Sequence, residues 1–566
     1  MRFHPRPPGD VEALPATLPP LLRRLYASRG VRAEELSLEL ARLLPPQMKG
    51  LDAAATLLHQ AIDAGRHIVI AGDYDADGAT ATALAVLGLR RLGATRVSYV
   101  VPDRFRMGYG LSPALAELAA AQGAELLVTV DNGIASLAGV ARAQALGMQV
   151  LITDHHLPGP ELPAAEVIVN PNQPGCPFGS RHLAGVGVMF YVLMALRARL
   201  REAGRYAQDA EPALAEWLDL VALGTVADVV RLDANNRILV AQGLRRIQAA
   251  RCRPGILALL DVAGRSPERI SSLDLGFVLG PRINAAGRLD DIRIGIECLL
   301  ADSLEQARPL AQALDAYNRE RRSIESGMRA EAEALSADLS ADGAALCLFD
   351  PGWHEGVVGL VASRIKDQCH RPVIAFARAQ EPGQLKGSGR TIPGLHLRDA
   401  LAAVDARHPG LITRFGGHAM AAGLSLPETA LPAFSAAFEA ICQAWLSPAD
   451  REQRLEHDGT LAADELSLDA ARELETAGPW GQGFPEPLFW GRFVVLDCRL
   501  LGAEQQHARY RLRGEVGAAL SAIHFNAGSA ARAGETIEAV YRCGINRYQG
   551  RETLELQIVQ LAERAQ

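Results

Sequence analysis

The sequence is poor in the features that mark secreted, membrane-bound and zinc-stabilised proteins. Its 566 residues include eight cysteines, no two of which form a CxxC pair, so neither a zinc ribbon nor a disulfide framework is indicated and reduced thiols are expected. No apolar run reaches the ~20 residues of a membrane-spanning helix, and the opening MRFHPRPPGD lacks the apolar core of a signal peptide. We therefore expect a cytoplasmic protein with no membrane contact.

An excess of positive charge is also missing. The formal net charge is −7, which gives no global support to nucleic-acid binding. It does not exclude such binding, because a carboxylate cluster adds negative charge that bound metal ions neutralise. The lysines are Lys49, Lys366 and Lys386, and arginine supplies the other basic side chains. Arginine suits phosphate recognition, but a GC-biased genome would produce the same excess, so this bias identifies no partner.

The composition is that of a globular protein, with 49% hydrophobic and 22% charged residues, and the length allows roughly three or four domains. Apolar strands alternate with Ala/Leu-rich helices through the first half, which predicts an α/β fold with a doubly wound parallel sheet. Later segments predict a long connecting helix near residues 300–338, a second α/β unit and a small C-terminal β-barrel. The expected domains are an N-terminal helical preface over 1–50, an α/β domain over 51–265, a connecting helical region over 266–340, a second α/β domain over 341–447 and a barrel over 455–566.

One stretch, IVIAGDYDADGATATALAV, places three aspartates, Asp73, Asp75 and Asp77, at alternate positions after an apolar run. Three anions this close repel one another unless a cation lies among them or water surrounds them. The apolar run predicts a buried strand, and the small residues that follow predict a helix packed on the sheet. The carboxylates would then lie at the carboxyl end of a strand, where open α/β sheets bind ligands. From this stretch alone, a solvated aspartate-rich turn is the alternative.

Other apolar runs end in the same kinds of side chain. ELLVTVDNG contains Asp131, MQVLITDHH ends in Asp154, His155 and His156, and WLDLVALGTVADVV carries Asp228. Parallel strands would bring these residues to the same sheet edge as the first three aspartates. Aspartates with histidine, and without cysteine, form a ligand set for Mn²⁺ or Mg²⁺. Two such ions would clamp a phosphate and activate a water molecule, so the pattern favours phosphoester hydrolysis.

Four motifs, DYDADG, VDNG, TDHH and GTVADVV, resemble in this order those of the DHH phosphoesterase superfamily. Within the superfamily, five further segments resemble the RecJ family of bacterial single-stranded-DNA-specific exonucleases: LAGVGV (183–188), PRINAAGR (281–288), WHEGVVGLVASR (353–364), GSGRTIPG (387–394) and RFGGHAMAAG (414–423). The resemblance covers nearly the whole chain from about residue 50. One departure is Thr391, where serine is expected, but the hydroxyl is retained.

The resemblance implies a DHH catalytic domain, a DHHA1-like substrate-binding domain and an OB-like barrel that binds single strands. It also implies a 5′ to 3′ exonuclease of DNA repair and recombination, which releases 5′-mononucleotides from single-stranded DNA with two divalent ions, Mn²⁺ or Mg²⁺. A monomer is expected, and single-stranded-DNA-binding protein and a RecQ-type helicase are partners by resemblance alone.

Two alternatives differ in function. The first is a DHH phosphodiesterase acting on short oligonucleotides or cyclic dinucleotides; such chains are generally shorter, and this function would not explain the C-terminal barrel. The second is a catalytically silent DNA-binding scaffold, which would be expected to have lost metal ligands.

The metal ligands implied by the resemblance are Asp73, Asp75, Asp77, Asp131, His155 and Asp228. Asp75 would hold one ion, Asp131 would bridge the two, and Asp77, His155 and Asp228 would hold the other. Asp73 is either a ligand or a neighbour of one. His156 would contact the scissile phosphate, and Asp154 would orient an imidazole through its free nitrogen. The implied catalytic residues are Asp75, Asp77, Asp131 and His156.

Substrate contacts are expected where short loops could cradle a phosphate. Glycines around His418 let backbone N–H groups approach an anion, and GSGRT offers two hydroxyls and an arginine in one loop, although either loop could be a simple tight turn. The expected substrate-binding residues are Arg282, Asn284, Arg288, His354, Arg364, Ser388, Arg390, Thr391, Gly416, Gly417 and His418. The first three could instead cap a helix.

The barrel segment interleaves arginines with aromatic residues, as in HARYRLRG and YRCGINRYQGR. Rings that stack on bases and guanidinium groups that follow the phosphates form a single-strand groove. The expected DNA contacts are Arg509, Tyr510, Arg511, Arg547 and Tyr548. The alternative is that these are solvated residues of exposed strands.

Overall fold

The computed structural model describes residues 2–104, 107–206, 211–337, 343–514, 518–528 and 530–562. The chain divides into two compact units. The larger unit consists of Pro7–Asn318 and Ser467–Pro487, and the smaller unit consists of Met1–Arg6, Arg319–Leu466 and Leu488–Gln566. The chain therefore passes between the units more than once.

The larger unit is built on a five-stranded parallel sheet in the order β3-β2-β4-β5-β6. Its strands are β2 (Ile68–Ala71), β3 (Val97–Val100), β4 (Leu126–Val130), β5 (Gln149–Thr153) and β6 (Val167–Val169). They are nearly continuous apolar runs because both faces are covered: Ile68 and Ile70 join one core cluster, while Val69 and Ala71 join another. The strand order reverses between β2 and β4, so residues that follow these two strands meet at the switch point, where such sheets bind ligands. The expected α/β class is confirmed.

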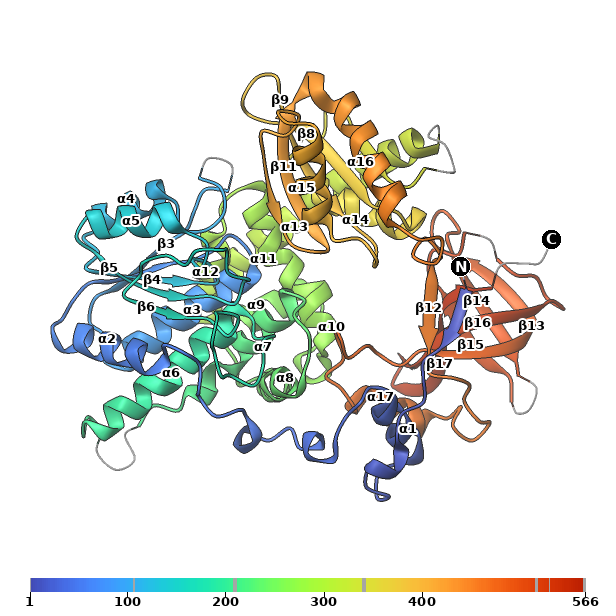
Figure 1. The fold of residues 1–566 in the computed structure, drawn as a ribbon. Coiled ribbons are helices and arrows are strands. Elements are labelled where there is room, and N and C mark those ends of the chain that lie inside the picture. The colour runs from blue at the N-terminus through green and yellow to red at the C-terminus, as the bar shows by residue number, and fades with distance from the viewer. Residues whose placement is uncertain are drawn as a thin grey trace. The chain divides into compact units, whose positions relative to one another are not determined.

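Helices cover both faces of this sheet (Figure 1). One face carries α4 (Pro113–Ala121) and α5 (Leu137–Ala145), and the other carries α2 (Leu51–Asp63), α3 (Ala76–Arg91) and α6 (Gly185–Glu202). The remaining helices include α1 (Pro20–Ser28), α7 (Leu218–Ala227), α8 (Ala234–Gln248), α9 (Pro254–Val262), α12 (Arg293–Leu300) and α17 (Leu468–Thr476). The expected long helix is α13 (Leu304–Ala337). None of the described helices has the length and apolar character needed to cross a membrane.

One helical stretch of the larger unit contains a π-helical turn. It begins with α10 (Ser272–Asp274), where Ser271 and Asp274 form a capping box, continues as a π-helix over Leu275–Leu279, and ends as α11 (Gly280–Leu289). Such turns are rare and often lie at functional sites. The PRINAAGR motif lies on α11, directly after the π-helix.

The smaller unit contains a mixed sheet and a barrel. The sheet has the order β10-β11-β9-β8-β7, with β7 and β8 parallel and the other neighbours antiparallel. Its strands are β7 (Leu346–Phe349), β8 (Val373–Arg378), β9 (Gln384–Arg390), β10 (Arg414–Gly417) and β11 (Ala421–Pro427), and its helices are α14 (Val358–Cys369), α15 (Leu397–Arg407) and α16 (Leu431–Trp445).

The C-terminal strands close into a five-stranded barrel in the order β13-β14-β15-β17-β16. They are β13 (Phe489–Leu501), β14 (His507–Arg513), β15 (Leu520–His524), β16 (Thr536–Tyr548) and β17 (Arg551–Leu561). Buried aromatic side chains, among them Phe489, Tyr510 and Tyr541, fill its interior. The expected β-barrel is therefore present.

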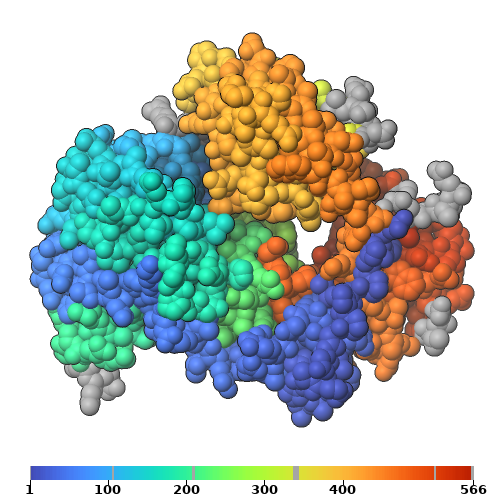
Figure 2. All heavy atoms as spheres, in the orientation of Figure 1, coloured from blue at the N-terminus to red at the C-terminus, as the bar shows by residue number. Residues whose placement is uncertain are grey.

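The chain's organisation differs from the expectation in two places. The N-terminal region includes a strand, β1 (Arg2–Pro5), which pairs in parallel with β12 (Arg454–His457), so the first residues lie beside a segment more than 400 positions away (Figure 2). Residues 467–487 belong to the larger unit rather than to the barrel, because Trp480 and Phe484 are buried in the larger unit's core.

Candidate metal centre

Side chains from several elements meet at the carboxyl edge of the parallel sheet. Asp73 and Asp75 follow β2, Asp77 lies in the first turn of α3, Asp131 follows β4, His155 follows β5 and Asp228 caps the end of α7. Three sets of ligand atoms lie within 4.8 Å of one another: Asp73 with Asp75 and Asp131, Asp77 with His155 and Asp228, and Asp131 with His155 and His156. The structure thus brings all six expected ligands together, with Asp131 shared between sets.

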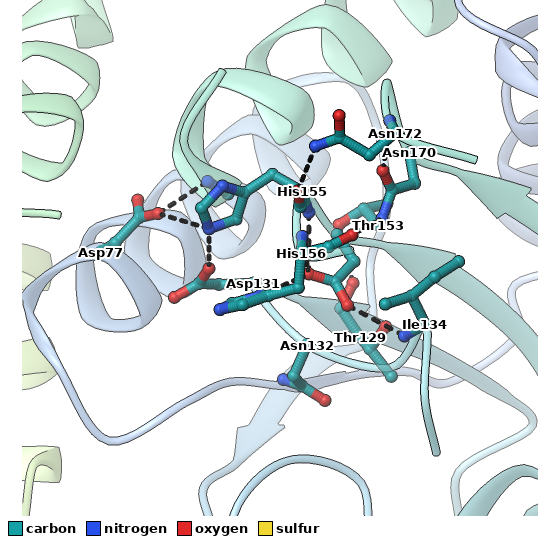
Figure 3. Close-up of polar contacts among 12 residues, drawn as sticks. Asp77, Thr129, Asp131, Asn132, Ile134, Thr153, His155, His156, Asn170 and Asn172 are labelled. Carbon is teal, nitrogen blue, oxygen red and sulfur yellow. Dashed lines mark hydrogen bonds and ion pairs between the residues drawn. The ribbon is translucent and has the colours of Figure 1, made fainter. Parts of the chain in front are cut away.

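His155 lies among three of these carboxylates. Its Nε2 atom is 3.1 Å from Asp131 Oδ1, 3.4 Å from Asp228 Oδ2 and 4.0 Å from Asp77 Oδ2. Figure 3 shows the imidazole ring between Asp77 and Asp131. Atoms on four different elements therefore face one small volume.

Two helix N-termini fix the aspartates. Asp77 accepts hydrogen bonds from the N–H groups of Gly185 (2.6 Å) and Val186 (3.0 Å), where the dipole of α6 favours an anion. Residue 185 must be glycine, because a Cβ atom there would lie 2.5 Å from the Cβ of Asp131. Asp75 caps α3 by accepting from Gly78 N at 3.0 Å. The LAGVGV motif thus shapes the site by close packing.

Asp131 itself has a left-handed backbone, with φ of 62°. Its N–H donates to Thr153 O at 3.1 Å, which ties the end of β4 to the end of β5. Strained backbone of this kind persists where surrounding contacts fix it, and it is frequent at functional sites.

The site carries more negative charge than its surroundings neutralise. Burial, followed by repulsion from neighbouring aspartates, raises the pKa of Asp73, Asp131 and Asp228 well above the usual range and that of Asp77 to about 7. Asp73 Oδ1 is buried and accepts no hydrogen bond from the described residues. Buried oxygen ligands with one imidazole and no thiolate fit hard divalent cations such as Mg²⁺ and Mn²⁺. The residues present therefore fit the ions expected from the sequence.

Asp154 orients His156. Its Oδ1 atom accepts from His156 Nδ1 (2.8 Å), His156 N (3.1 Å) and His155 N (2.7 Å), and its Oδ2 atom accepts from Ile134 N (2.9 Å). Burial acts to raise the pKa of Asp154, but the hydrogen bond and charge of His156 lower it below the usual value. Burial acts to lower the pKa of His156, and the bond to Asp154 raises it to about 8. The carboxylate therefore holds the ring through Nδ1, as expected of Asp154.

The sequence interpretation missed three residues at this edge. Asn170 and Asn172, which follow β6, donate to the carbonyl oxygens of His156 (2.9 Å) and His155 (2.6 Å). Tyr109 donates from its hydroxyl to Asp131 O at 3.0 Å and lies edge-on to the His156 ring. The two asparagines could have been found from the sequence, because they follow an apolar run just as the aspartates do. No local sequence pattern identifies Tyr109 as part of the site.

Among the expected substrate contacts on α11, Asn284 and Arg282 form hydrogen bonds with other residues of the protein. Asn284 Oδ1 accepts from Ala76 N at 2.7 Å and so caps the start of α3, which corresponds to the helix-capping alternative. Arg282 is buried, pairs with Asp315 at 3.0 Å and donates to Val278 O at 2.7 Å. Arg288 lies in the last turn of the same helix. Asn284 thus helps to place α11 beside the DYDADG segment, and Arg282 connects α11 to α13.

In the smaller unit, most of the GSGRT and GGH segments, expected as loops, lies in strands β9 and β10, which flank β11 in the sheet. Ser388 and Arg390 on β9 pair with Gly423 and Ala421 on β11, and Gly423 also pairs with Gly416 on β10. Helix α14 starts next to them, since a Cβ atom on its second residue, Gly359, would lie 2.8 Å from Ser388 Oγ and 3.1 Å from Arg390 Nη2. A helix N-terminus, a hydroxyl and a guanidinium therefore meet at one place, which is a suitable environment for a phosphate.

The other expected residues of this unit differ in exposure. Gly416, Gly417 and His418 are exposed, and Gly417 has a backbone φ of 141°, a conformation that favours glycine. Thr391 is buried. Arg364 is exposed and pairs with Glu325 at 3.2 Å, and His354 accepts from Gly356 N at 3.1 Å.

One expected DNA contact on the barrel is wrong. Along β14 the side chains alternate, so Ala508, Tyr510 and Leu512 point inward while Arg509 and Arg511 are exposed. Tyr510 is 1% exposed and its hydroxyl accepts from Ala531 N at 3.2 Å, so its ring is part of the core and cannot stack on a base. Tyr548, by contrast, is 69% exposed. Arg509 and Arg547 pair with Glu555 (3.4 Å) and Glu552 (2.8 Å).

Comparison with known proteins identifies three family models in the chain. The model described as "DHH family, N-terminal domain" matches residues 67–225, the "DHHA1 domain" matches residues 342–444 and the "RecJ OB domain" matches residues 457–560. The first match contains five of the six gathered side chains.

Full-length relatives agree with these matches. The chain is 52% identical to the single-stranded-DNA-specific exonuclease RecJ of Salmonella typhimurium over 97% of both chains. Two crystal structures of RecJ from Thermus thermophilus are also similar. The complex with Mn²⁺ has a TM-score of 0.83 and 32% sequence identity, and the match covers 100% of this chain and 80% of the Thermus chain. The complex with Mg²⁺ has a TM-score of 0.73 and 30% sequence identity, and the match covers 98% of this chain and 79% of the Thermus chain. The chain therefore belongs to the RecJ family, within the DHH family.

Proposed function

We propose that this protein is a metal-dependent exonuclease that degrades single-stranded DNA. The observation that carries the proposal is the group of five carboxylates and one imidazole at the carboxyl edge of the parallel sheet. The names of its RecJ relatives, and the Mn²⁺ and Mg²⁺ complexes of the Thermus protein, support the same activity and cofactors.

The residues proposed to hold two ions are Asp73, Asp75, Asp77, Asp131, His155 and Asp228. One ion would be held by Asp73, Asp75 and Asp131, and another by Asp77, His155 and Asp228. Asp131 would contribute to both, because its Oδ1 atom also lies 3.1 Å from His155 Nε2. Two bound ions supply charge to the scissile phosphate and lower the pKa of a water molecule.

The protein's own groups would position the substrate. The ring of His156 is held through Nδ1 by Asp154, and its Nε2 atom lies 3.0 Å from the Tyr109 hydroxyl; this nitrogen would hydrogen-bond to the scissile phosphate in place of the tyrosine. Asn170 and Asn172 hold the main chain from which both histidine rings project. Orientation of this kind reduces the entropy lost on reaching the transition state.

Binding of the remaining strand is proposed for the smaller unit. Ser388, Arg390 and the N–H groups around His418 would bind a backbone phosphate, and the exposed Arg511 and Tyr548 would bind the strand on the barrel. The 5′ to 3′ polarity and the release of 5′-mononucleotides follow from the family resemblance. A cytoplasmic location and association with single-stranded-DNA-binding protein and a RecQ-type helicase stay predictions on the same basis.

The test is digestion of end-labelled DNA by the purified full chain with Mn²⁺, with Mg²⁺ or with EDTA. A 5′-labelled single strand should release its label at once as a mononucleotide, a 3′-labelled strand should shorten progressively, and blunt duplex DNA should resist. Asp131→Asn should abolish release, because the amide is neutral and offers one ligand oxygen where a ligand shared by two ions needs two. Asp52→Asn, an exposed aspartate on α2, is the matched control and should behave as wild type.

Two results would contradict the proposal. One is release that continues in EDTA after exhaustive dialysis. The other is faster turnover of dinucleotides or cyclic dinucleotides than of long strands, which would identify the phosphodiesterase alternative.

A further inference from the structure

The turn that follows Asp228 has a strained backbone. Val229 has φ of 61°, in the left-handed region, and its side chain is 63% exposed. A β-branched residue rarely adopts this conformation, which persists where surrounding contacts fix it. The short segment from Asp228 to Leu232 joins α7 to α8, so whatever fixes it also fixes the Asp228 carboxylate.

A distant segment of the chain contacts this turn. Leu232 N donates to Gln482 O at 2.8 Å. The two glycines beside Gln482 pack so closely that a Cβ atom on Gly481 would lie 2.7 Å from Leu232 Cδ1, and one on Gly483 would lie 2.5 Å from Arg231 Cγ. Residues 481–483 therefore set the position of the turn through both its main chain and its side chains.

The same segment is firmly seated on the larger unit. The rings of Trp480 and Phe484 stack with centroids 5.0 Å apart, and the guanidinium of Arg237 lies 4.5 Å from the Phe484 ring centroid. Ala477 O accepts from Tyr26 Oη at 2.8 Å, and Trp480 O accepts from Ser272 Oγ at 2.6 Å, at the start of the stretch that carries α11. We call residues 477–484 the anchor segment.

A buried amide continues the contact toward a second aspartate. Asn236 Nδ2 donates to Arg231 O (2.8 Å) in the turn and to His182 O (2.6 Å). His182 lies three residues before Gly185, whose N–H group binds Asp77. The anchor segment thus contacts a turn that is linked by hydrogen bonds to the loop that holds Asp77.

We propose that the anchor segment positions Asp228 in the metal centre by holding the strained turn at Arg231 and Leu232. The inference rests on the proposed function, because it takes Asp228 as a metal ligand. The anchor residues touch neither substrate nor metal ion, so they are positioning residues that act through the turn.

The variant that tests this role is Gly483→Ala. Gly483 is exposed, so the added methyl group removes nothing from the core, but it would displace Arg231. The matched control is Gly264→Ala. Gly264 is also exposed, lies in the same unit and has a similar backbone angle, with φ of 64° against 70° for Gly483. It differs in that no atom lies within 4 Å of the position a Cβ atom would take. Both variants carry the same backbone strain, and they differ in the contact with the turn. Phe484→Leu, which removes the ring beneath Arg237, is an independent second variant.

Binding of Mn²⁺ to the full-length protein is measured from the electron paramagnetic resonance signal of the ion that stays free in solution. The values of kcat and KM for single-stranded DNA are measured on the same variants. Gly483→Ala and Phe484→Leu should bind one of two ions about 10-fold more weakly, in the range seen when outer contacts of metal ligands are lost, while Gly264→Ala binds both as wild type does. Excess Mn²⁺ should restore kcat, and KM for DNA should not change.

Equal Mn²⁺ affinity in Gly483→Ala and Gly264→Ala, with two ions bound by each, would overturn the inference and leave the proposed function intact. A wild-type protein that binds no Mn²⁺ would overturn both. A rise in KM for DNA at unchanged Mn²⁺ affinity would assign the anchor segment to substrate binding and contradict its role in positioning Asp228.

Discussion

Replacing Asp154 by asparagine tests the support of the histidine pair. The carboxylate accepts four hydrogen bonds, three at Oδ1 and one at Oδ2. An amide has one acceptor oxygen, and its best orientation keeps the three bonds at Oδ1 and turns the NH₂ group toward Ile134 N. That buried N–H then faces another donor, and the three remaining bonds lose their charged acceptor.

The cost can be worked from these contacts. Leaving one buried donor unsatisfied costs about 1–3 kcal/mol, and weakening the three other bonds adds to it, so destabilisation of roughly 2–4 kcal/mol is expected. His156 also loses the charge that holds its Nδ1–H, and its ring is free to reorient. Loss of a partner that orients an active-site imidazole typically lowers activity by roughly 10- to 100-fold, which is the fall expected in kcat.

The assay is hydrolysis of a single-stranded oligonucleotide under saturating Mn²⁺, with thermal melting and Mn²⁺ stoichiometry measured on the same preparations. Asp154→Asn should melt at a lower temperature, turn over more slowly and still bind the same number of ions, and Asp52→Asn should match wild type in all three. Turnover within a factor of about two of wild type would refute the orienting role, since an unrestrained ring costs more than that. Loss of a bound ion would instead make Asp154 a ligand.

Three further predictions concern other parts of the protein. Arg390→Ala and His418→Ala should each lower kcat/KM by an amount equivalent to about 1.5–3 kcal/mol, because a charge-assisted contact with a phosphate is lost. The Mn²⁺ content of both variants should equal that of wild type. A variant that binds less Mn²⁺ would contradict the role in phosphate binding. Arg511→Ala and Tyr548→Ala should weaken the binding of long single strands, and the arginine variant should also reduce the salt dependence of binding. Hydrolysis of very short oligonucleotides should change little. Equal losses on long and short substrates would exclude binding of the strand by the barrel. In EDTA, the melting temperature should fall between about pH 4 and about pH 7, because the pKa of Asp77 is raised from 3.8 to about 7 in the folded protein. Its contribution to stability is fully present below the lower value and is lost as the pH rises to the upper one. Added Mn²⁺ should remove the fall, and a flat profile in EDTA would contradict the raised pKa.

The sequence by itself determined that these acidic and histidine side chains gather at one edge of the parallel sheet. Asp73, Asp131 and His155 each follow an apolar run that is long enough for a strand and too apolar for a surface. Strands of this kind pack in parallel with both faces covered, and their carboxyl ends share one edge of the sheet. The convergence of these side chains is therefore encoded locally, one strand end at a time. The inward direction of Tyr510 was readable in the same way, from the alternation of apolar residues in HARYRLR.

The tertiary structure alone decided which residues support that centre. Asn284 could have lined a strand's path or capped a helix, and its contact with Ala76, more than 200 positions away, makes it a cap. The anchor segment lies between the two α/β regions and the barrel in sequence, yet Gln482 holds the turn after Asp228. Neither contact leaves a periodicity or a composition signal, because each depends on how two remote segments pack. Local patterns fix strands, helices and their ends, whereas support for a site comes from long-range packing that a single sequence does not display.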